Sequence, residues 1–422
     1  MDKSDLKTFA IILAVFLLFY YVPPDSPWLH AALANGVALA SDYARAHVLL
    51  CLVPAFFIAG AVSTFLDRAT VTRHLGASAS KTKAYGVASI SGGVLAVCSC
   101  TVLPMFAGIY RMGAGLGPAT TFLYAGPAIN VLAVALTASA LGAELGVARA
   151  VGAVGLSLVV GLAMAAFFRT KPRADAANDP LAKADADESS LGVASAITAA
   201  LIGALVFANW SDADPTMAPI KWYVVAVFGV SLAAILVARF RLPLWRIAAS
   251  IAATGAAAFV DPTLAFTVAG AGLALTLHAE GGKLGEWLEE TWGFAKQIMP
   301  LLFIGVFVAG AAFGAHEEPG LVPPEWVREA VGGESLLANA LASALGALMY
   351  FATLTEIPII EGLLDGGMGE GPALALLLAG PAVSLPNMLV VRSVLGTRKT
   401  LAFVGVTVLV STAAGFVYGA MF

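Results

Sequence analysis

Charge is scarce in this chain. Only 12% of its 422 residues are charged, whereas 59% are hydrophobic, and a soluble domain of average composition carries about twice that share of charge. The apolar residues form a long series of runs of about 20 residues, which is the length that crosses a bilayer as an α-helix. Because these runs do not alternate with polar residues, they predict spanning helices rather than barrel strands.

Other absences narrow the range of functions. Three cysteines are too few for a disulfide framework, and the five histidines are scattered without metal-ligand spacing. A net charge of −4 without a basic patch argues against nucleic acid as a partner. Since no P-loop is present, the chain is not itself an ATPase. We expect no enzyme activity, no cofactor and no metal.

An internal repeat is the most informative positive feature. Residues 101–130 recur at 355–384 with a constant offset of 254. The first copy contributes Thr101, Pro104, Gly108, Gly113, Gly115, Gly117, Pro118, Ala119, Leu123, Ala125, Gly126, Pro127 and Ala128, which match Thr355, Pro358, Gly362, Gly367, Gly369, Gly371, Pro372, Ala373, Leu377, Ala379, Gly380, Pro381 and Ala382. Repeats that carry Pro and Gly where helices should be continuous are typical of secondary transporters.

The distribution of Lys and Arg predicts the topology. Basic residues near span ends collect in the cytoplasm, so we place the N-terminus and the basic loops after residues 66, 168 and 391 inside, and the segment 23–45 outside as a loop. This assignment requires residues 84–110 and 335–360 to be re-entrant or broken-helix hairpins, the first turning near residues 98–104. The remaining spans are expected near 8–22, 47–66, 116–137, 147–168, 191–209, 221–239, 243–260, 262–278, 297–314, 371–391 and 400–420.

The predicted fold class is therefore an all-α polytopic membrane protein with two inverted repeats and about 10–13 membrane segments. Five parts are expected. They are an N-terminal span with an external loop (1–46), a first transmembrane repeat (47–168), a flexible cytoplasmic linker (169–190), intervening spans (191–296) and a second transmembrane repeat (297–422). We expect a multi-pass protein of the cell inner membrane that contacts lipid and a small-molecule substrate, and a homo-oligomer is compatible with the sequence. Trp222, Trp287 and Trp292 are expected to anchor at the membrane interface.

Two strings carry a resemblance to a known family. They are Val97-Cys98-Ser99-Cys100-Thr101-Val102-Leu103-Pro104, followed by Ala125-Gly126-Pro127-Ala128-Ile129-Asn130, and Thr355-Glu356-Ile357-Pro358, followed by Ala379-Gly380-Pro381-Ala382-Val383-Ser384-Leu385-Pro386-Asn387. Both resemble the predicted-permease family that includes the ArsP-type organoarsenical efflux permeases. The resemblance covers both repeats and implies a permease, whereas substrate is not uniform across the family.

Cys98 and Cys100 are the candidate ligands for a soft solute. Thiolates bind thiophilic centres such as trivalent arsenic, and two thiols in an unwound turn can reach one centre. The same residues are equally explained as small packing residues, since free cysteine is often buried. Cys51 is a possible third thiol, although a lone cysteine in a span is more often core. A membrane thiol oxidoreductase that uses Cys98 and Cys100 is an alternative of another class.

Glu356 is the candidate proton-coupling residue. It replaces the aligned Val102 and lies at the expected tip of the second hairpin, where an ionisable group is costly unless it has a role. Capping of a broken helix is the alternative reading. Further substrate contacts are expected near the tips from Thr101, Pro104, Asn130, Thr355, Pro358, Ser384 and Asn387, although each polar member could equally make an interhelical hydrogen bond. The function these features favour is export of a soft, thiol-reactive solute by proton antiport, with a permease or channel for another small solute or metal ion as the alternative.

The inverted arrangement predicts opposite accessibility for two equivalent residues. Arg111 of the first repeat aligns with Asp365 of the second, and we expect Arg111→Cys to be labelled from the cytoplasm and Asp365→Cys from outside. A membrane-impermeant thiol reagent applied to intact cells and to everted vesicles measures this. Labelling of both positions from one side contradicts the inversion.

Overall fold

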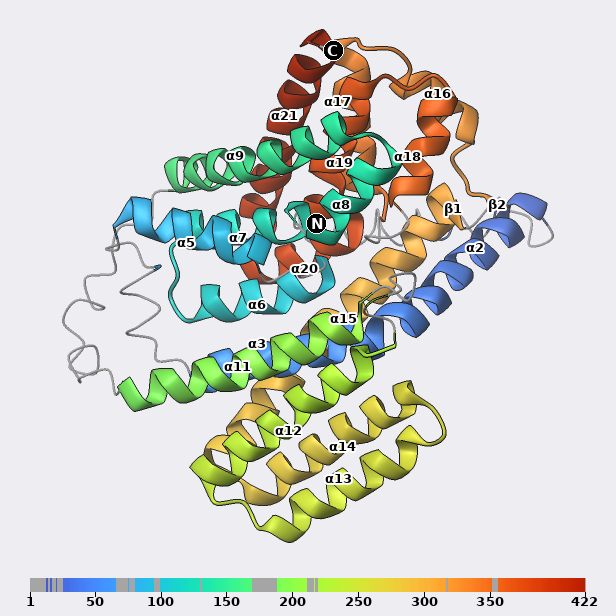
Figure 1. Cartoon of the computed structure of the whole chain (residues 1–422). Coiled ribbons are helices and arrows are strands. Elements are labelled where there is room, and N and C mark those ends of the chain that lie inside the picture. The colour runs from blue at the N-terminus through green and yellow to red at the C-terminus, as the bar shows by residue number, and fades with distance from the viewer. Residues whose placement is uncertain are drawn as a thin grey trace.

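The computed structural model shows a helical protein (Figure 1). The residues that it describes are 26–65, 80–94, 99–129, 131–168, 188–210, 219–315, 318–350 and 356–421, with the single residues 13, 16, 20, 75 and 216. The first predicted span, 8–22, thus lies almost wholly outside the described residues. Within them the only strands are the two-residue pair β1 (Gly314–Ala315) and β2 (Glu318–Pro319).

The helices of the first half follow one another closely in sequence. They are α2 (Pro27–Tyr43), the π-helix η1 (Ala44–Leu52), α3 (Val53–Phe65), α5 (Lys81–Val94), α6 (Ser99–Arg111), α7 (Leu116–Ala128), α8 (Val131–Ala140) and α9 (Ala143–Phe167). We expected a loop over 23–45, but residues 27–43 form α2, which continues into η1 and packs along α15. The packing against α15 explains why a segment that contains Asp42 is helical.

The second half has the same pattern. Its helices are α15 (Gly282–Phe313), α16 (Pro324–Val331), α17 (Leu336–Leu348), α18 (Glu356–Asp365), α19 (Glu370–Val383), α20 (Leu385–Leu395) and α21 (Thr397–Met421). Subtracting 254 from the bounds of α21 gives those of α9, and the same shift brings α17, α18, α19 and α20 within three residues of α5, α6, α7 and α8 at each end. The sequence repeat is thus a repeat of structure that covers five consecutive helices.

Backbone conformation repeats as well. Gly113 and Gly367 have φ values of 102° and 95°, and Gly142 and Gly396 have 107° and 80°. These left-handed values favour glycine because it lacks a Cβ atom. Each glycine ends one helix and allows the chain to turn into the next at the same point of both repeats.

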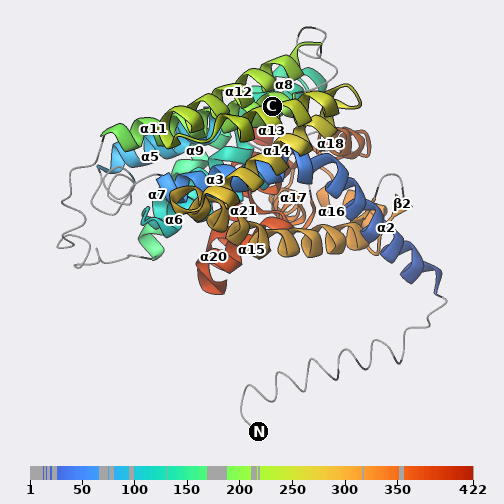
Figure 2. The same cartoon turned by 90° about the horizontal axis from the view of Figure 1, so that it is seen from below.

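Helices α11 (Glu188–Ala208), α12 (Lys221–Phe240), α13 (Leu244–Ala258) and α14 (Pro262–Glu280) form the intervening part. Helix α11 packs on α3 and α12, and α14 packs on α13 and α15. Figures 1 and 2 show α12, α13 and α14 on the far side of α3 and α15 from the two hairpins. Trp287, which we expected at an interface, is instead fully buried on α15 and donates a hydrogen bond from Nε1 to the Phe57 carbonyl oxygen at 2.8 Å.

Fewer helices cross a membrane unaided than the segment number suggested. Six described helices are long and apolar enough to span a bilayer, or seven if the bent pair α19 and α20 is one span. Part of the difference arises because α5 to α8 and α17 to α20 have only 10 to 14 residues, which are too short to cross alone. The predicted spans 191–209 and 243–260 fall on shorter apolar helices, and the predicted span 8–22 lies almost wholly outside the described residues. Two predicted continuous spans, 116–137 and 371–391, are in fact broken, after Ala128 and after Val383.

Each predicted hairpin segment, 84–110 and 335–360, contains the end of one described helix and the start of the next. Between α5 and α6 the described helices stop at Val94 and resume at Ser99, so Pro104 lies inside α6 rather than in the turn that we expected at 98–104. Helix α18 likewise resumes at Glu356 after α17 ends at Leu348. Helices α6 and α18 therefore both start within the strings that carry the family resemblance.

Close glycine contacts hold α7 to α9 and α19 to α21. A Cβ atom on Gly161 would lie 2.8 Å from the Gly117 carbonyl oxygen, and one on Gly371 would lie 2.7 Å from the Gly415 carbonyl oxygen. Gly371 and Gly415 are the repeat counterparts of Gly117 and Gly161. Small residues that let helix backbones approach are a main source of helix association in membranes.

The two hairpin mouths carry charges of opposite sign. At the end of α6, Arg111 hydrogen bonds to Gln297 of α15, and Lys399 at the start of α21 donates to the Tyr110 hydroxyl at 3.1 Å. This end of the molecule therefore gathers basic residues from both repeats.

The equivalent end of the second repeat is acidic. The Glu334 carboxylate accepts a hydrogen bond from the Gly371 amide at 3.1 Å, and Glu144 and Glu370 lie within electrostatic range of Tyr418 together with Glu334. Glu144 begins α9 at the position that corresponds to Arg398 at the start of α21. The exchange of Arg for Glu at equivalent helix starts is the pattern that an inverted pair of repeats would show.

We predict that Gly415→Ala destabilises the protein by about 1–3 kcal/mol, because the new methyl group overlaps the Gly371 carbonyl oxygen in a contact that neither backbone can relax. Gly405→Ala, in the same helix but with no atom within 4 Å of the added Cβ, is the matched control and is expected to be neutral or slightly stabilising. Thermal unfolding of the two variants in detergent measures the difference. Equal melting temperatures would show that the glycine contact does not limit the approach of α19 and α21.

Candidate functional site

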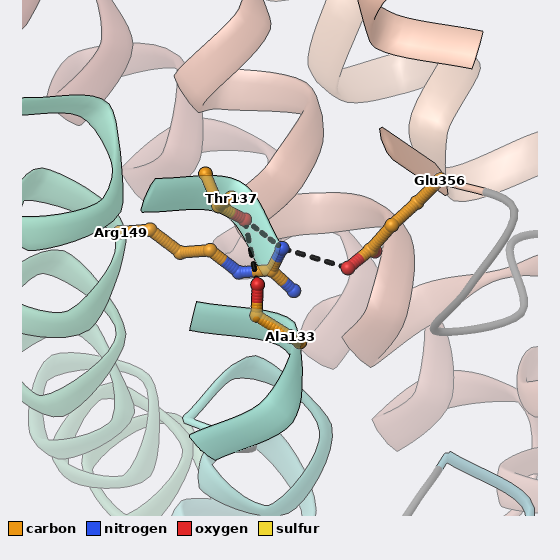
Figure 3. Close-up of polar contacts among 4 residues, drawn as sticks. All are labelled: Ala133, Thr137, Arg149 and Glu356. Atoms are coloured by element: carbon orange, nitrogen blue, oxygen red, sulfur yellow. Dashed lines mark hydrogen bonds and ion pairs between the residues drawn. The ribbon is translucent and has the colours of Figure 1, made fainter. Parts of the chain in front are cut away.

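A buried ion pair joins the two repeats. Arg149 of α9 and Glu356, the first residue of α18, place Nη1 and Oε1 2.7 Å apart, with the side chains 0% and 2% exposed (Figure 3). Charged groups inside a membrane protein are costly and are retained where they have a role. This pair is the candidate functional site.

Thr137 of α8 fixes the guanidinium. Arg149 Nη1 donates to Thr137 Oγ1 at 2.8 Å, and the Thr137 hydroxyl donates to the Ala133 carbonyl oxygen at 2.8 Å. A hydrogen-bonded chain of this kind orients each member. Arg149 is therefore held by two elements of the first repeat and presents its charge to the second.

The site has no symmetric counterpart. The positions that correspond to Arg149 and Glu356 are Phe403 and Val102, both buried and apolar, and Thr137 corresponds to the buried Val391. The two repeats thus share helix geometry but differ in chemistry. Of the two equivalent pairs of positions, only that of Arg149 and Glu356 is charged.

When each helix is replaced by its counterpart 254 residues away, one contact between the repeats becomes another such contact. Helix α6 packs against α20, and its counterpart α18 packs against α8, while α7 packs on α19 and α9 on α21. Reciprocal contacts of this type are the property of a two-fold arrangement. The ion pair therefore lies at one of two reciprocal contacts that hold a hairpin helix to the other repeat.

The sequence-predicted residues divide between the two hairpins. Thr101 is fully buried near the start of α6, and its Oγ1 lies 3.2 Å from Cys51 Sγ. Cys51 is thus next to the residue that follows Cys100. Pro104 is buried in α6. Cys100 belongs to α6, but its side chain and all of Cys98 lie outside the described residues.

In the second hairpin, Glu356 is described, while Thr355 lies outside the described residues and Pro358 is described only as part of α18. Ser384 precedes α20 at the break, and the buried Asn387 donates from Nδ2 to the Pro381 carbonyl oxygen at 3.1 Å. This bond satisfies a carbonyl at the end of α19. Asn130, the counterpart of Ser384, lies outside the described residues at the matching break.

Arg149 and Thr137 are the site residues that the sequence did not indicate. Arg149 lies within the predicted span 147–168, because windowed hydropathy tolerates one arginine near a helix start. A usable signal existed, since an arginine within an apolar helix that has no basic neighbours is a functional hypothesis by default.

The geometry can be compared with known proteins. Residues 33–420 match the family described as a predicted permease, ArsP_1. The chain belongs to this permease family. The permease is 38% identical to the UPF0718 protein MJ0584 of Methanocaldococcus jannaschii over 380 residues, which cover 90% of this chain and 93% of that protein. It is 35% identical to the UPF0718 protein YraQ of Escherichia coli over 134 residues, 32% of this chain and 36% of that protein. No solved structure matches the permease.

We predict that replacing the ion pair with the apolar residues found at the equivalent positions of the other contact preserves folding and removes transport. Glu356→Val alone leaves Arg149 as an unpaired buried charge and is expected to cost about 3–5 kcal/mol of stability. The double variant Arg149→Phe/Glu356→Val reproduces Phe403 and Val102, and replacement of a buried pair by packed apolar residues is often neutral. Thermal unfolding with solute flux in parallel measures both properties. A double variant that transports normally would show that the ion pair is structural.

Proposed function

We propose that this membrane permease is a secondary-active transporter in which the two repeats are inverted and alternately open a site between them. The observation that carries the proposal is the ion pair across the repeats, at one of two reciprocal hairpin contacts. Discontinuous helices at repeat interfaces are where such transporters bind solutes. The basic and acidic ends described above support the inversion.

Glu356 is proposed to couple transport to protons. When the carboxyl group gains a proton, it no longer neutralises Arg149, so the attraction that holds the start of α18 to α9 falls. Protonation of Glu356 can therefore shift the equilibrium between closure of the α18–α8 contact and closure of the α6–α20 contact. In an antiport cycle the unloaded carrier returns with Glu356 protonated.

The proposed solute is soft and thiol-reactive, such as a trivalent organoarsenical, and is exported. Cys98 and Cys100 are the proposed ligands. The position of Cys51 against Thr101 supports this choice, because it brings a third thiol next to the residue that follows Cys100.

We predict saturable, proton-gradient-dependent uptake of methylarsenite into everted membrane vesicles, and its loss in Cys98→Ser/Cys100→Ser. No uptake in any variant removes trivalent arsenic as the substrate, whereas equal uptake in the native chain and the cysteine variant makes the cysteines packing residues. A channel would show flux that does not saturate at low solute.

We predict that Glu356→Gln abolishes the response of that uptake to the proton gradient, because the amide cannot exchange a proton. Glu280→Gln is the matched control. Glu280 also pairs with an arginine, Arg246, but its side chain is 27% exposed, so the control should respond like the native chain. A Glu356→Gln variant that still follows the gradient would assign coupling to another group.

A further inference from the structure

One edge of the Arg149 guanidinium is left without a hydrogen-bond partner. Arginine has five N–H donors. Those of Nη1 face Glu356 and Thr137, whereas Nε and Nη2 have no partner among the residues that the structure describes, although the side chain is 0% exposed. A buried donor without a partner costs free energy, more so on a charged group. Such an edge is explained if a ligand completes it.

The shape of the free edge specifies the ligand chemistry. The Nε and Nη2 donors of a guanidinium point in parallel and match two oxygens of a carboxylate, phosphate or phosphonate. A single water molecule can satisfy only part of this fork. The surroundings are also polar, because the buried Tyr124 of α7 lies within electrostatic range of Arg149 and beside Ser411 of α21.

We propose that the free edge of Arg149 is a binding subsite for an oxyanion group, and that this oxyanion competes with Glu356 for the guanidinium. The inference rests on the proposal that solute is handled between the two repeats, and it adds an acidic group to the solute class.

Competition follows from the charges. With Glu356 ionised, the pair is neutral, so an incoming oxyanion adds an uncompensated negative charge to a buried site. The oxyanion therefore binds most favourably when the Glu356 carboxylate moves away from the Arg149 guanidinium. Departure of Glu356 frees the start of α18 from α9, so occupation of the subsite and release of the hairpin contact are one event.

The test is direct binding to the purified full-length protein in detergent, with methylphosphonate and acetate as probes and calorimetry as the readout. Methylphosphonate is expected to bind the native protein. Arg149→Lys keeps the charge but loses the fork and should weaken binding about tenfold or more. Glu356→Gln removes the competitor and should tighten binding about tenfold, a gain that damage to the fold would not produce.

Matched controls come from the exposed pair. Arg246→Lys and Glu280→Gln alter the Arg246–Glu280 pair on α13 and α14, and both should bind as the native protein does. Phosphatidate in mixed micelles carries the same phosphate group on a lipid, and we expect it not to displace methylphosphonate from a side chain that is fully buried.

Three results would overturn the proposal. They are absence of binding by both the native protein and Glu356→Gln, equal affinity of the native protein and Arg149→Lys, and binding of phosphatidate in place of the small oxyanions. Because binding is measured without a membrane gradient, a failure of arsenical flux in vesicles leaves this result unchanged, and the two proposals fail separately.

Discussion

The ion pair between Arg149 and Glu356 is the interaction on which the relation of the two repeats depends. The repeats also meet through the hydrogen bond from Lys399 to the Tyr110 hydroxyl and through apolar side chains, whose attraction changes little when one helix slides along another. An ion pair in apolar surroundings repays the cost of removing its charges from water only when its geometry is close to ideal. It therefore distinguishes one relative position of the repeats from others, which apolar contacts alone do not.

The glycine contacts limit where movement can occur. Helices α7 and α9 touch backbone to backbone at Gly117 and Gly161, and α19 and α21 do so at the equivalent positions. Such contacts do not tolerate sliding, because there is no side chain to rearrange. Each helix pair is therefore a unit, and we expect relative motion at the contacts between the repeats, which are those of α7 with α19, α9 with α21, α6 with α20 and α18 with α8. Glu356 lies at the last of these.

The sequence predicted the class of protein and the repeats because both depend on patterns that are local or periodic. Apolar runs define spans, and matched Pro and Gly residues define where the helices break. The buried position of Glu356 was anticipated on the same basis, since a charge in an apolar run is visible without a structure. The expectation that Pro104 lies in the hairpin turn is wrong because Pro104 is accommodated within α6. The expectation of a loop over residues 27–43 is wrong because their packing partner, α15, lies far away in sequence.

Arg149 could not be paired with Glu356 from the sequence for a related reason. The linker and the intervening helices α11 to α14 lie between the two residues in sequence, and only the fold brings α9 to α18. The sequence did not indicate Thr137 either, because a threonine in a helix commonly donates a hydrogen bond to its own helix backbone. Its second role, as acceptor for Arg149, is evident only from the structure. Long-range polar partners are the part of this site that local patterns do not encode.

The constant offset has a historical consequence. From α5 to α9 and from α17 to α21, the helices keep one interval of 254 residues, so neither copy has gained or lost a residue within this stretch relative to the other. The simplest ancestor is a symmetric dimer of one shorter chain, in which every inter-subunit contact occurred twice. Within a single chain the two copies can differ, and Val102 with Phe403 and Glu356 with Arg149 are different solutions at equivalent positions. Specialisation of one of two equal contacts is a freedom that the dimer, with a single gene for both halves, did not have.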